Sequence, residues 1–179
     1  MGSWGITAME SDAGLDALAA IREQIAEEGR LDAAQILHVF KKDAWNAPPD
    51  SIEGQAHTSP MMLAEVMKKI QEGEAGSLDY EWEKKKFSGL HSFTASRESL
   101  GWLRGYLTET LKNSREREAA KAVPDGKWGG WFQEKDWKSW QMHMESLIGY
   151  LDGVLEAPGE TLELMPAREQ RLCQMKMEG

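Results

Sequence analysis

The sequence predicts a mainly α fold, a compact bundle of about five helices, with either one small β-hairpin or a short helix around residues 78–94. Apolar residues recur at spacings of three and four in five segments, and these segments carry helix start or stop signals. No internal repeat of solenoid length interrupts this pattern. Connections of moderate length between five helices favour a bundle. We expect residues 1–157 to form a single helical domain and residues 158–179 to form a partly ordered C-terminal tail.

Three helices are predicted in the first half of the chain. The first starts at Ser11 or Asp12, either of which can cap it, and ends near Gly29. The second runs from residue 32 to about residue 44. The third has Ser59 as its cap and Pro60 in its first helical position, and it ends near residue 73. Their inward faces are the sets Leu15, Leu18, Ile21 and Ile25; Ala33, Ile36, Leu37 and Phe40; and Leu63, Val66, Met67 and Ile70.

The second half is predicted to contain two longer helices. Before them, Leu78, Tyr80 and Trp82 alternate with acidic residues, as in a half-buried strand, but a segment this short also fits a helix. Ser96 is the expected cap of a fourth helix that reaches about residue 122. The fifth helix is predicted from about residue 134 to residue 156. Its inward stripe is Trp137, Trp140, Met144, Leu147, Leu151 and Val154.

The charge balance argues against nucleic-acid binding. The chain has 21 basic and 30 acidic residues, for a net charge of −9, and residues 1–60 alone carry 4 basic and 10 acidic residues. Neutralising phosphates requires clustered Lys and Arg. An acidic surface instead favours fast encounter with a basic partner, although surplus carboxylates also serve solubility alone. We therefore expect a protein partner that is basic, and no direct contact with nucleic acid.

The composition also predicts a location for the chain. Cys173 is the only cysteine, so no internal disulfide forms, which fits a reducing compartment. No segment approaches the roughly 20 apolar residues that span a bilayer. The first ten residues lack the basic flank and apolar core of a signal peptide. We expect a cytoplasmic protein without a membrane contact.

No pattern of a catalytic, metal or cofactor site is present in the sequence. The four histidines, His38, His57, His91 and His143, are isolated, and none pairs with another His or Cys at a spacing that puts two ligands on one helix face. Cys173 has no activating neighbour in the sequence. The glycines do not cluster as a phosphate-binding loop. We therefore predict no catalytic residue, no metal and no cofactor.

Tryptophan is the unusual component of this sequence. Eight tryptophans occur, and four of them lie between residues 128 and 140. Trp137 and Trp140 fall on the inward stripe of the fifth helix, whereas a Gly-Gly pair between Trp128 and Trp131 suggests an exposed turn. Because tryptophan is enriched at binding hot spots, we predict that Trp128 and Trp131 contact a partner. The carboxylates of Glu10, Asp12 and Asp16 are predicted to belong to the same contact surface.

The first residues, MGSWGITAMESDAGLDAL, resemble a small bacterial family, domain of unknown function 4259, whose members open Met-Gly-x-Trp-Gly. The positions that match are Gly2, Trp4, Gly5, Glu10, Asp12, Ala13 and Asp16, and the helix LAEVMKKI is also similar. The resemblance covers about a third of the chain, and Ile6 to Met9 depart from the family pattern. It implies a bacterial source and a structural role for the motif, in which Trp4 tucks into the bundle. It implies no activity.

These observations favour a non-enzymatic acidic protein that binds and inhibits a basic partner, such as a toxin, nuclease or defence complex. Bacterial immunity proteins and phage or plasmid anti-defence proteins, including anti-CRISPR inhibitors, fit this description. One alternative is an enzyme whose site is assembled from dispersed residues, with Glu10, Asp12, Asp16 and a distant His as its parts. Another alternative is a homo-oligomeric accessory protein that associates through the fifth helix.

Overall fold

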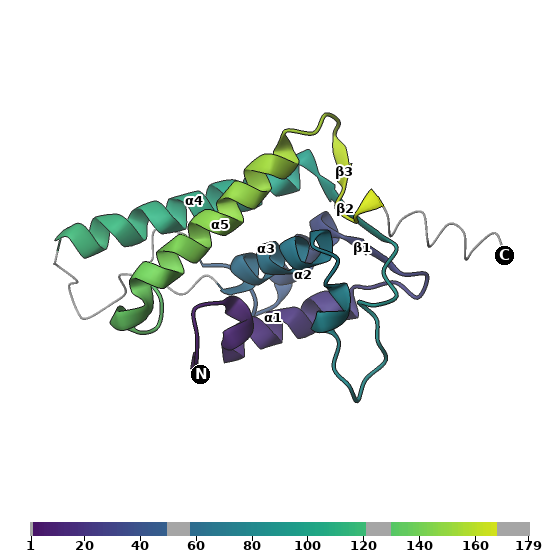
Figure 1. Cartoon of the computed structure of the whole chain (residues 1–179), viewed down its shortest axis with the longest axis horizontal. Coiled ribbons are helices and arrows are strands. Elements are labelled where there is room, and N and C mark those ends of the chain that lie inside the picture. Colours follow the sequence, from purple (N-terminus) through teal and green to yellow (C-terminus); the bar gives the residue numbers. More distant parts are fainter. Residues whose placement is uncertain (1, 50–57, 121–129, 168–179) are drawn as a thin grey trace.

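The computed structural model describes residues 2–49, 58–120 and 130–167, which form five α-helices and a small mixed sheet (Figure 1). The helices are α1 (Asp12–Glu23), α2 (Ala33–Lys42), α3 (Thr58–Gln71), α4 (Arg97–Ala120) and α5 (Trp137–Leu155). The 3₁₀ turn η1 (Ala8–Glu10) precedes α1, η2 (Ala75–Leu78) lies between α3 and α4, and η4 (Glu134–Asp136) directly precedes α5. Figure 1 shows α4 and α5 running antiparallel, side by side. The predicted mainly α fold with five helices is confirmed.

The helix starts follow local side-chain chemistry. Ser11 accepts a hydrogen bond from the Gly14 backbone N–H at 3.0 Å, as predicted for the cap of α1, and Ser96 accepts one from the Ser99 N–H at 3.1 Å. These bonds satisfy amides that have no partner inside the helix. The predicted start of α3 was wrong by two residues, because the helix begins at Thr58 and Ser59 lies inside it. Its hydroxyl donates to the Asn46 carbonyl at 2.7 Å and so ties the preceding loop to α3.

The core is built around α3. This helix packs against α1, α4 and α5, and Figure 1 shows it between α1 and the pair of long helices. A helix that is covered on all sides must be apolar almost throughout. Only one buried residue of α3 carries a charge, Glu65. The other buried residues of α3 are Ser59, Pro60, Met61, Met62, Leu63, Ala64, Val66, Met67 and Ile70.

A three-stranded sheet closes one end of the helices. Its strands are β1 (Arg30–Asp32), β2 (Ser92–Ser96) and β3 (Thr161–Glu163), with β2 in the centre. β1 pairs with β2 in parallel and places Leu31 opposite Phe93, and β3 pairs with β2 antiparallel and places Leu162 opposite Ala95. Neither alternative predicted for residues 78–94 is correct, because no hairpin forms and the short helical turn η2 ends at Leu78. The partners of β2 lie far away in the sequence, and residues 79–91 form turns.

The start of the expected C-terminal tail is continuous with the core. β3 belongs to the sheet, and the Leu164 N–H donates to the Phe93 carbonyl at 2.8 Å. Leu162, Leu164 and Met165 are buried. Residues 161–165 therefore complete the hydrophobic core at the sheet, and residues 168–179 lie outside the described part of the chain.

Arg97 at the start of α4 is predicted to stabilise the end of α5. Its guanidinium donates to the carbonyls of Leu155 and Gly159, at 2.9 and 2.8 Å, and also to the Ala157 carbonyl. Hydrogen bonds from a charged donor contribute about 1.5–3 kcal/mol each, and less where they are exposed to water, so Arg97→Ala should lower the free energy of unfolding by about 2 kcal/mol. Urea denaturation measures this change. Arg104→Ala removes one exposed ion pair on the same helix and should change stability far less.

Candidate functional site

The residues predicted to contact a partner do not form one surface. Trp131 is only 1% exposed, so its predicted exposure is wrong. Its indole N–H donates to the Gly5 carbonyl at 2.6 Å, and its ring stacks on Trp140 at 6.3 Å. A side chain at Gly130 would crowd Ser114 and the Trp137 ring, whereas glycine leaves room for them. Trp131 thus holds the N-terminal segment through its bond to Gly5. Trp128 lies outside the described residues.

The three acidic residues of the prediction have different roles. Glu10 accepts hydrogen bonds from the N–H and the hydroxyl of Thr7, at 3.2 and 2.8 Å, and thereby holds η1. Asp12 and Asp16 are exposed on α1, one turn apart, and Glu23 lies two turns further along the same stripe. We call Asp12, Asp16 and Glu23 the acidic face of α1. Only this part of the prediction provides an exposed charged surface.

Trp4 is exposed, contrary to the expectation from the family resemblance. Its side chain is 61% exposed, whereas its backbone N–H donates to the Glu10 carbonyl at 2.9 Å. The chain around it is fixed by the bridge between Ser3 and Ser11. The N-terminal segment is therefore held by its backbone and by Trp131, and Trp4 faces solvent beside the start of α1.

A buried arginine organises the loop between η2 and β2. Arg22 of α1 is 8% exposed, and its guanidinium lies 3.1 Å from the carboxylate of Glu83 and 3.8 Å from that of Asp79. It also donates to the Lys84 carbonyl and lies over the ring of Tyr80, 5.8 Å from its centroid. A buried cation needs such partners, because leaving water costs several kcal/mol. Arg22 thus ties residues 79–84 to α1.

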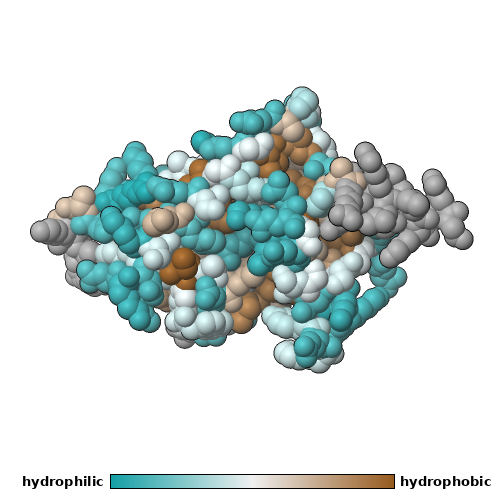
Figure 2. All heavy atoms as spheres, in the orientation of Figure 1, coloured by the Kyte–Doolittle hydropathy of each residue, from teal (hydrophilic) through white to brown (hydrophobic). Residues whose placement is uncertain are grey.

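The same loop is closed by the side chain of Asp79. Its carboxylate accepts the N–H groups of Phe87 and Ser88, at 2.9 and 2.8 Å, and the Ser88 hydroxyl. Leu78 and Phe87 are buried and anchor the two ends. We call residues 79–88 the Trp82 loop. It extends beyond the helices beside α1 in Figure 1, and the visible face in Figure 2 is hydrophilic there.

The Trp82 loop presents an aromatic pair to solvent. Trp82 is 80% exposed, and its ring stacks on Tyr80 with the centroids 5.3 Å apart and the planes 8° from parallel. Glu81, Lys84 and Lys85 are exposed around it. The loop therefore offers a large, rigid apolar ring surrounded by charges.

Trp45, on the turn after α2, is exposed like Trp4 and Trp82. The Trp45 N–H donates to the Asp43 carboxylate at 2.9 Å, and this bond lowers the pKa of Asp43 below its ordinary value. The turn is ordered by its own backbone. In the described part of the chain, no ring stacks on Trp45 and no buried ion supports it.

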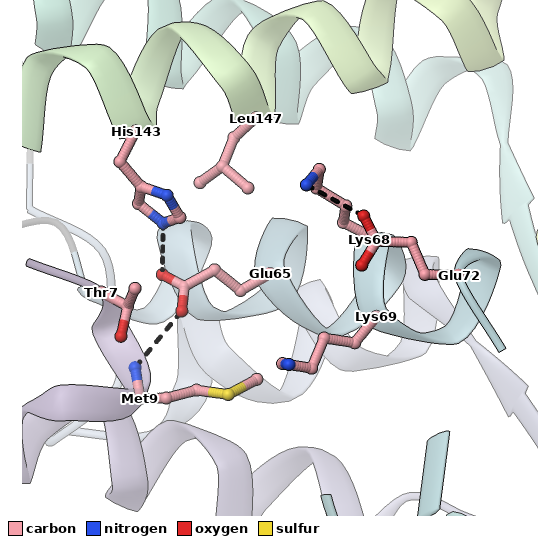
Figure 3. Close-up of a pocket in the computed structure, with 8 residues that line it drawn as sticks. All are labelled: Thr7, Met9, Glu65, Lys68, Lys69, Glu72, His143 and Leu147. Carbon is pink, nitrogen blue, oxygen red and sulfur yellow. Dashed lines mark hydrogen bonds and ion pairs between the residues drawn. The ribbon is translucent and has the colours of Figure 1, made fainter. Parts of the chain in front are cut away.

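A cavity lies where η1, α3 and α5 meet (Figure 3). Its volume is about 360 Å³, within the range of small-molecule sites. We call it the α3–α5 cavity. The residues that line it are Thr7, Met9, Glu65, Lys68, Lys69, Glu72, His143 and Leu147. Figure 3 shows that α3 supplies its charged residues and α5 supplies His143 and Leu147 from the other side.

Glu65 is the buried charge of this cavity. Its side chain is 5% exposed, and its two oxygens accept the N–H groups of Ala8 and Met9, at 2.7 and 3.3 Å. The Nε2 atom of His143 lies 3.3 Å from the oxygen that Ala8 also contacts. Glu65 thus joins η1, α3 and α5 at one point. Each of its two carboxylate oxygens accepts a hydrogen bond.

The structure brings together a histidine and carboxylates, but not the ones that the enzyme alternative named. His143 meets Glu65, whereas Glu10, Asp12 and Asp16 do not line the cavity. Within residues 2–49, 58–120 and 130–167, no group of three or more His, Cys, Asp or Glu side chains is placed to hold a metal ion. Nor does any described helix combine the length and apolar character needed to cross a membrane.

Two signals in the sequence could have pointed to these sites. Glu65 interrupts an otherwise apolar run from Met61 to Met67, and a lone carboxylate on a buried face requires a donor nearby. Arg22 is the only basic residue of α1 and lies beside the apolar stripe. The donors and acceptors of both residues come from distant segments, so spacing alone could not identify them.

In comparisons with known proteins, no family model, no curated protein and no solved structure matches this chain. The resemblance to the domain of unknown function 4259 family therefore stays a prediction. The functional proposals below depend on the geometry of the Trp82 loop, the acidic face of α1 and the α3–α5 cavity.

Replacing Arg22 is expected to release the Trp82 loop. Arg22→Ala leaves the buried Asp79 carboxylate without its cation, and breaking such a pair typically costs about 3 kcal/mol or more. We expect faster hydrogen exchange of the Phe87 and Ser88 amides, measured by NMR. The amides of α3 report global unfolding and serve as the internal reference. If the loop amides keep their exchange rates relative to those of α3, Arg22 does not order the loop.

Proposed function

We propose that this chain is a non-enzymatic binding protein that docks on a protein partner through the Trp82 loop and the acidic face of α1, and thereby blocks that partner. Two linked observations carry the proposal. The buried Arg22 side chain fixes the Trp82 loop, and Trp82 on that fixed loop faces water. The acidic face belongs to α1, and Arg22 ties the Trp82 loop to the same helix, so one partner can contact both surfaces.

The energetics of the loop support a docking role. Leaving a large apolar side chain in water forgoes roughly 2–3 kcal/mol of burial free energy. Taking Arg22 out of water adds a further cost that its ion pairs only partly offset. A fixed loop, however, loses little conformational entropy when a partner binds, which raises affinity. Tryptophan in such a position commonly acts as an anchor that fills a pocket of the partner.

The charges define the partner more closely. Asp12, Asp16 and Glu23 form a stripe of like charge on a chain whose net charge is −9, so basic groups of the partner are favoured opposite α1. Glu81, Lys84 and Lys85 on the loop carry both signs of charge, so we expect the partner to receive Trp82 in an apolar pocket with a polar rim. Toxins, nucleases and nucleic-acid-binding defence complexes have basic surfaces of the kind that α1 would contact. Immunity-like and anti-defence inhibition, including inhibition of CRISPR nucleases, are the roles that we infer from this match.

The α3–α5 cavity supports the enzyme alternative less well. His143 and Glu65 lie within reach of each other, as a general acid and base would. Glu65, however, already accepts two backbone N–H groups that hold η1 in place. A carboxylate that holds two backbone N–H groups has a structural role, and using it as a base would weaken the bonds that hold η1 in place.

The docking role of Trp82 can be tested with a partner retained by the full-length chain from cells that encode it. For the purified partner, Trp82→Ala should weaken binding at least about tenfold, because truncating a hot-spot residue typically costs about 2 kcal/mol or more. Calorimetry measures the Kd. Trp45→Ala is the matched control, since it removes an exposed tryptophan away from the Trp82 loop and should leave the Kd unchanged. Equal affinity of the Trp82→Ala variant and the unaltered chain would refute the docking loop.

The acidic face of α1 should control how fast the complex forms. Changing Asp12, Asp16 and Glu23 to Lys is expected to lower the association rate constant by about tenfold or more at low salt, with a smaller effect on dissociation. Stopped-flow measurements at low and high salt separate these effects, since salt screens exposed charges. The matched control reverses Glu98, Glu109 and Glu116 on α4. If both triple variants slow association equally, net charge rather than α1 is responsible.

A further inference from the structure

We propose that the α3–α5 cavity is a binding site for a small organic anion, a molecule with a carboxylate or phosphate group on a compact apolar body. This inference does not depend on the docking function. The cavity has a volume of about 360 Å³ and is lined from three elements that are distant in the sequence. Three features indicate the chemistry of the ligand: the charged side chains, the apolar walls, and the hydrogen bonds that Glu65 already accepts.

Glu65 does not exclude an anion from this cavity. Its oxygens accept the Ala8 and Met9 N–H groups and lie next to the Nε2 atom of His143. Two backbone donors and an imidazole nitrogen therefore surround a carboxylate that is almost fully buried. The same contacts already offset part of the negative charge of Glu65, which weakens its attraction for a cationic ligand.

Two lysines provide the positive charge. Lys68 pairs with Glu72 at 3.0 Å and Lys69 pairs with Glu74 at 3.2 Å, and each lysine side chain is about a third exposed. Exposed ion pairs of this kind contribute about 0–1 kcal/mol, so an incoming anion can compete with either carboxylate for its lysine. Glu72 also lines the cavity and must turn away when an anion binds Lys68. In Figure 3 the Lys69 side chain extends toward Met9, while Lys68 lies on the side of Leu147.

Apolar side chains provide the rest of the binding surface. Met9 comes from η1 and Leu147 from α5, and they lie across the cavity from each other (Figure 3). A methionine wall adapts to flat or irregular ligands because its side chain is flexible and polarisable. An inorganic ion would leave these walls uncovered, whereas an aromatic or short aliphatic acid would cover them. The cavity therefore fits an organic anion better than inorganic phosphate.

The proposal is tested by titrating the full chain with 2-naphthoate, 2-naphthyl phosphate, the neutral 2-naphthamide and inorganic phosphate. Binding is followed through the methyl signals of ¹³C-labelled methionines. We expect at least one naphthyl anion to shift the Met9 signal and to bind about tenfold or more tightly than the amide and inorganic phosphate. Comparing the two anions shows which acidic group is preferred. Met165, which lines a different groove near β3, should not respond.

Two double variants distinguish binding at the cavity from a general effect of the protein's charge. Changing Lys68 and Lys69 to Gln should weaken binding of the preferred anion by about tenfold, while the thermal unfolding temperature shows that the fold is kept. Changing Lys112 and Lys135 to Gln removes two exposed cations elsewhere and should leave the affinity unchanged. The proposal is overturned if the amide binds as tightly as both anions, if neither anion shifts Met9, or if the Lys68 and Lys69 variant retains full affinity.

Discussion

The contact on which this account depends is the one between Arg22 and the Trp82 loop. A guanidinium that is almost completely buried pairs with Asp79 and Glu83, donates to the Lys84 carbonyl and covers the ring of Tyr80. Each partner belongs to one loop, so the arginine fixes a surface segment to α1. Because these contacts fix the loop, Trp82 is exposed in a single ordered conformation.

Glu65 is a buried anion that holds a neighbouring segment in place, as the buried cation Arg22 does. It is the single buried ion of the central helix, and it holds η1 through two backbone amides while α5 approaches through His143. The two buried ions thus act alike: each connects a helix of the core to a segment that does not belong to a long helix. One fixes the loop that carries Trp82, and the other forms the wall of the α3–α5 cavity.

The sequence predicted what depends on neighbours along the chain. The five helices and the caps at Ser11 and Ser96 follow from spacing and from side-chain chemistry within one turn, and the structure confirms them. The sheet was not predicted, because β2 pairs with strands more than 60 residues away on either side. Trp131 was predicted to be exposed because Gly-Gly suggests a turn, but Ser3, Gly5 and Trp140 cover it from distant positions. The functional sites share this property, since Arg22 and Glu65 act on segments that no local pattern connects to them.

The central claim is that one face, made of α1 and the Trp82 loop, contacts the partner. Hydrogen exchange of the chain with and without its bound partner tests this most directly, because it maps the contact without changing any residue. The account predicts slower exchange in residues 79–88 and on α1, with little change on α4. Protection confined to α4, or to the sheet, would contradict it.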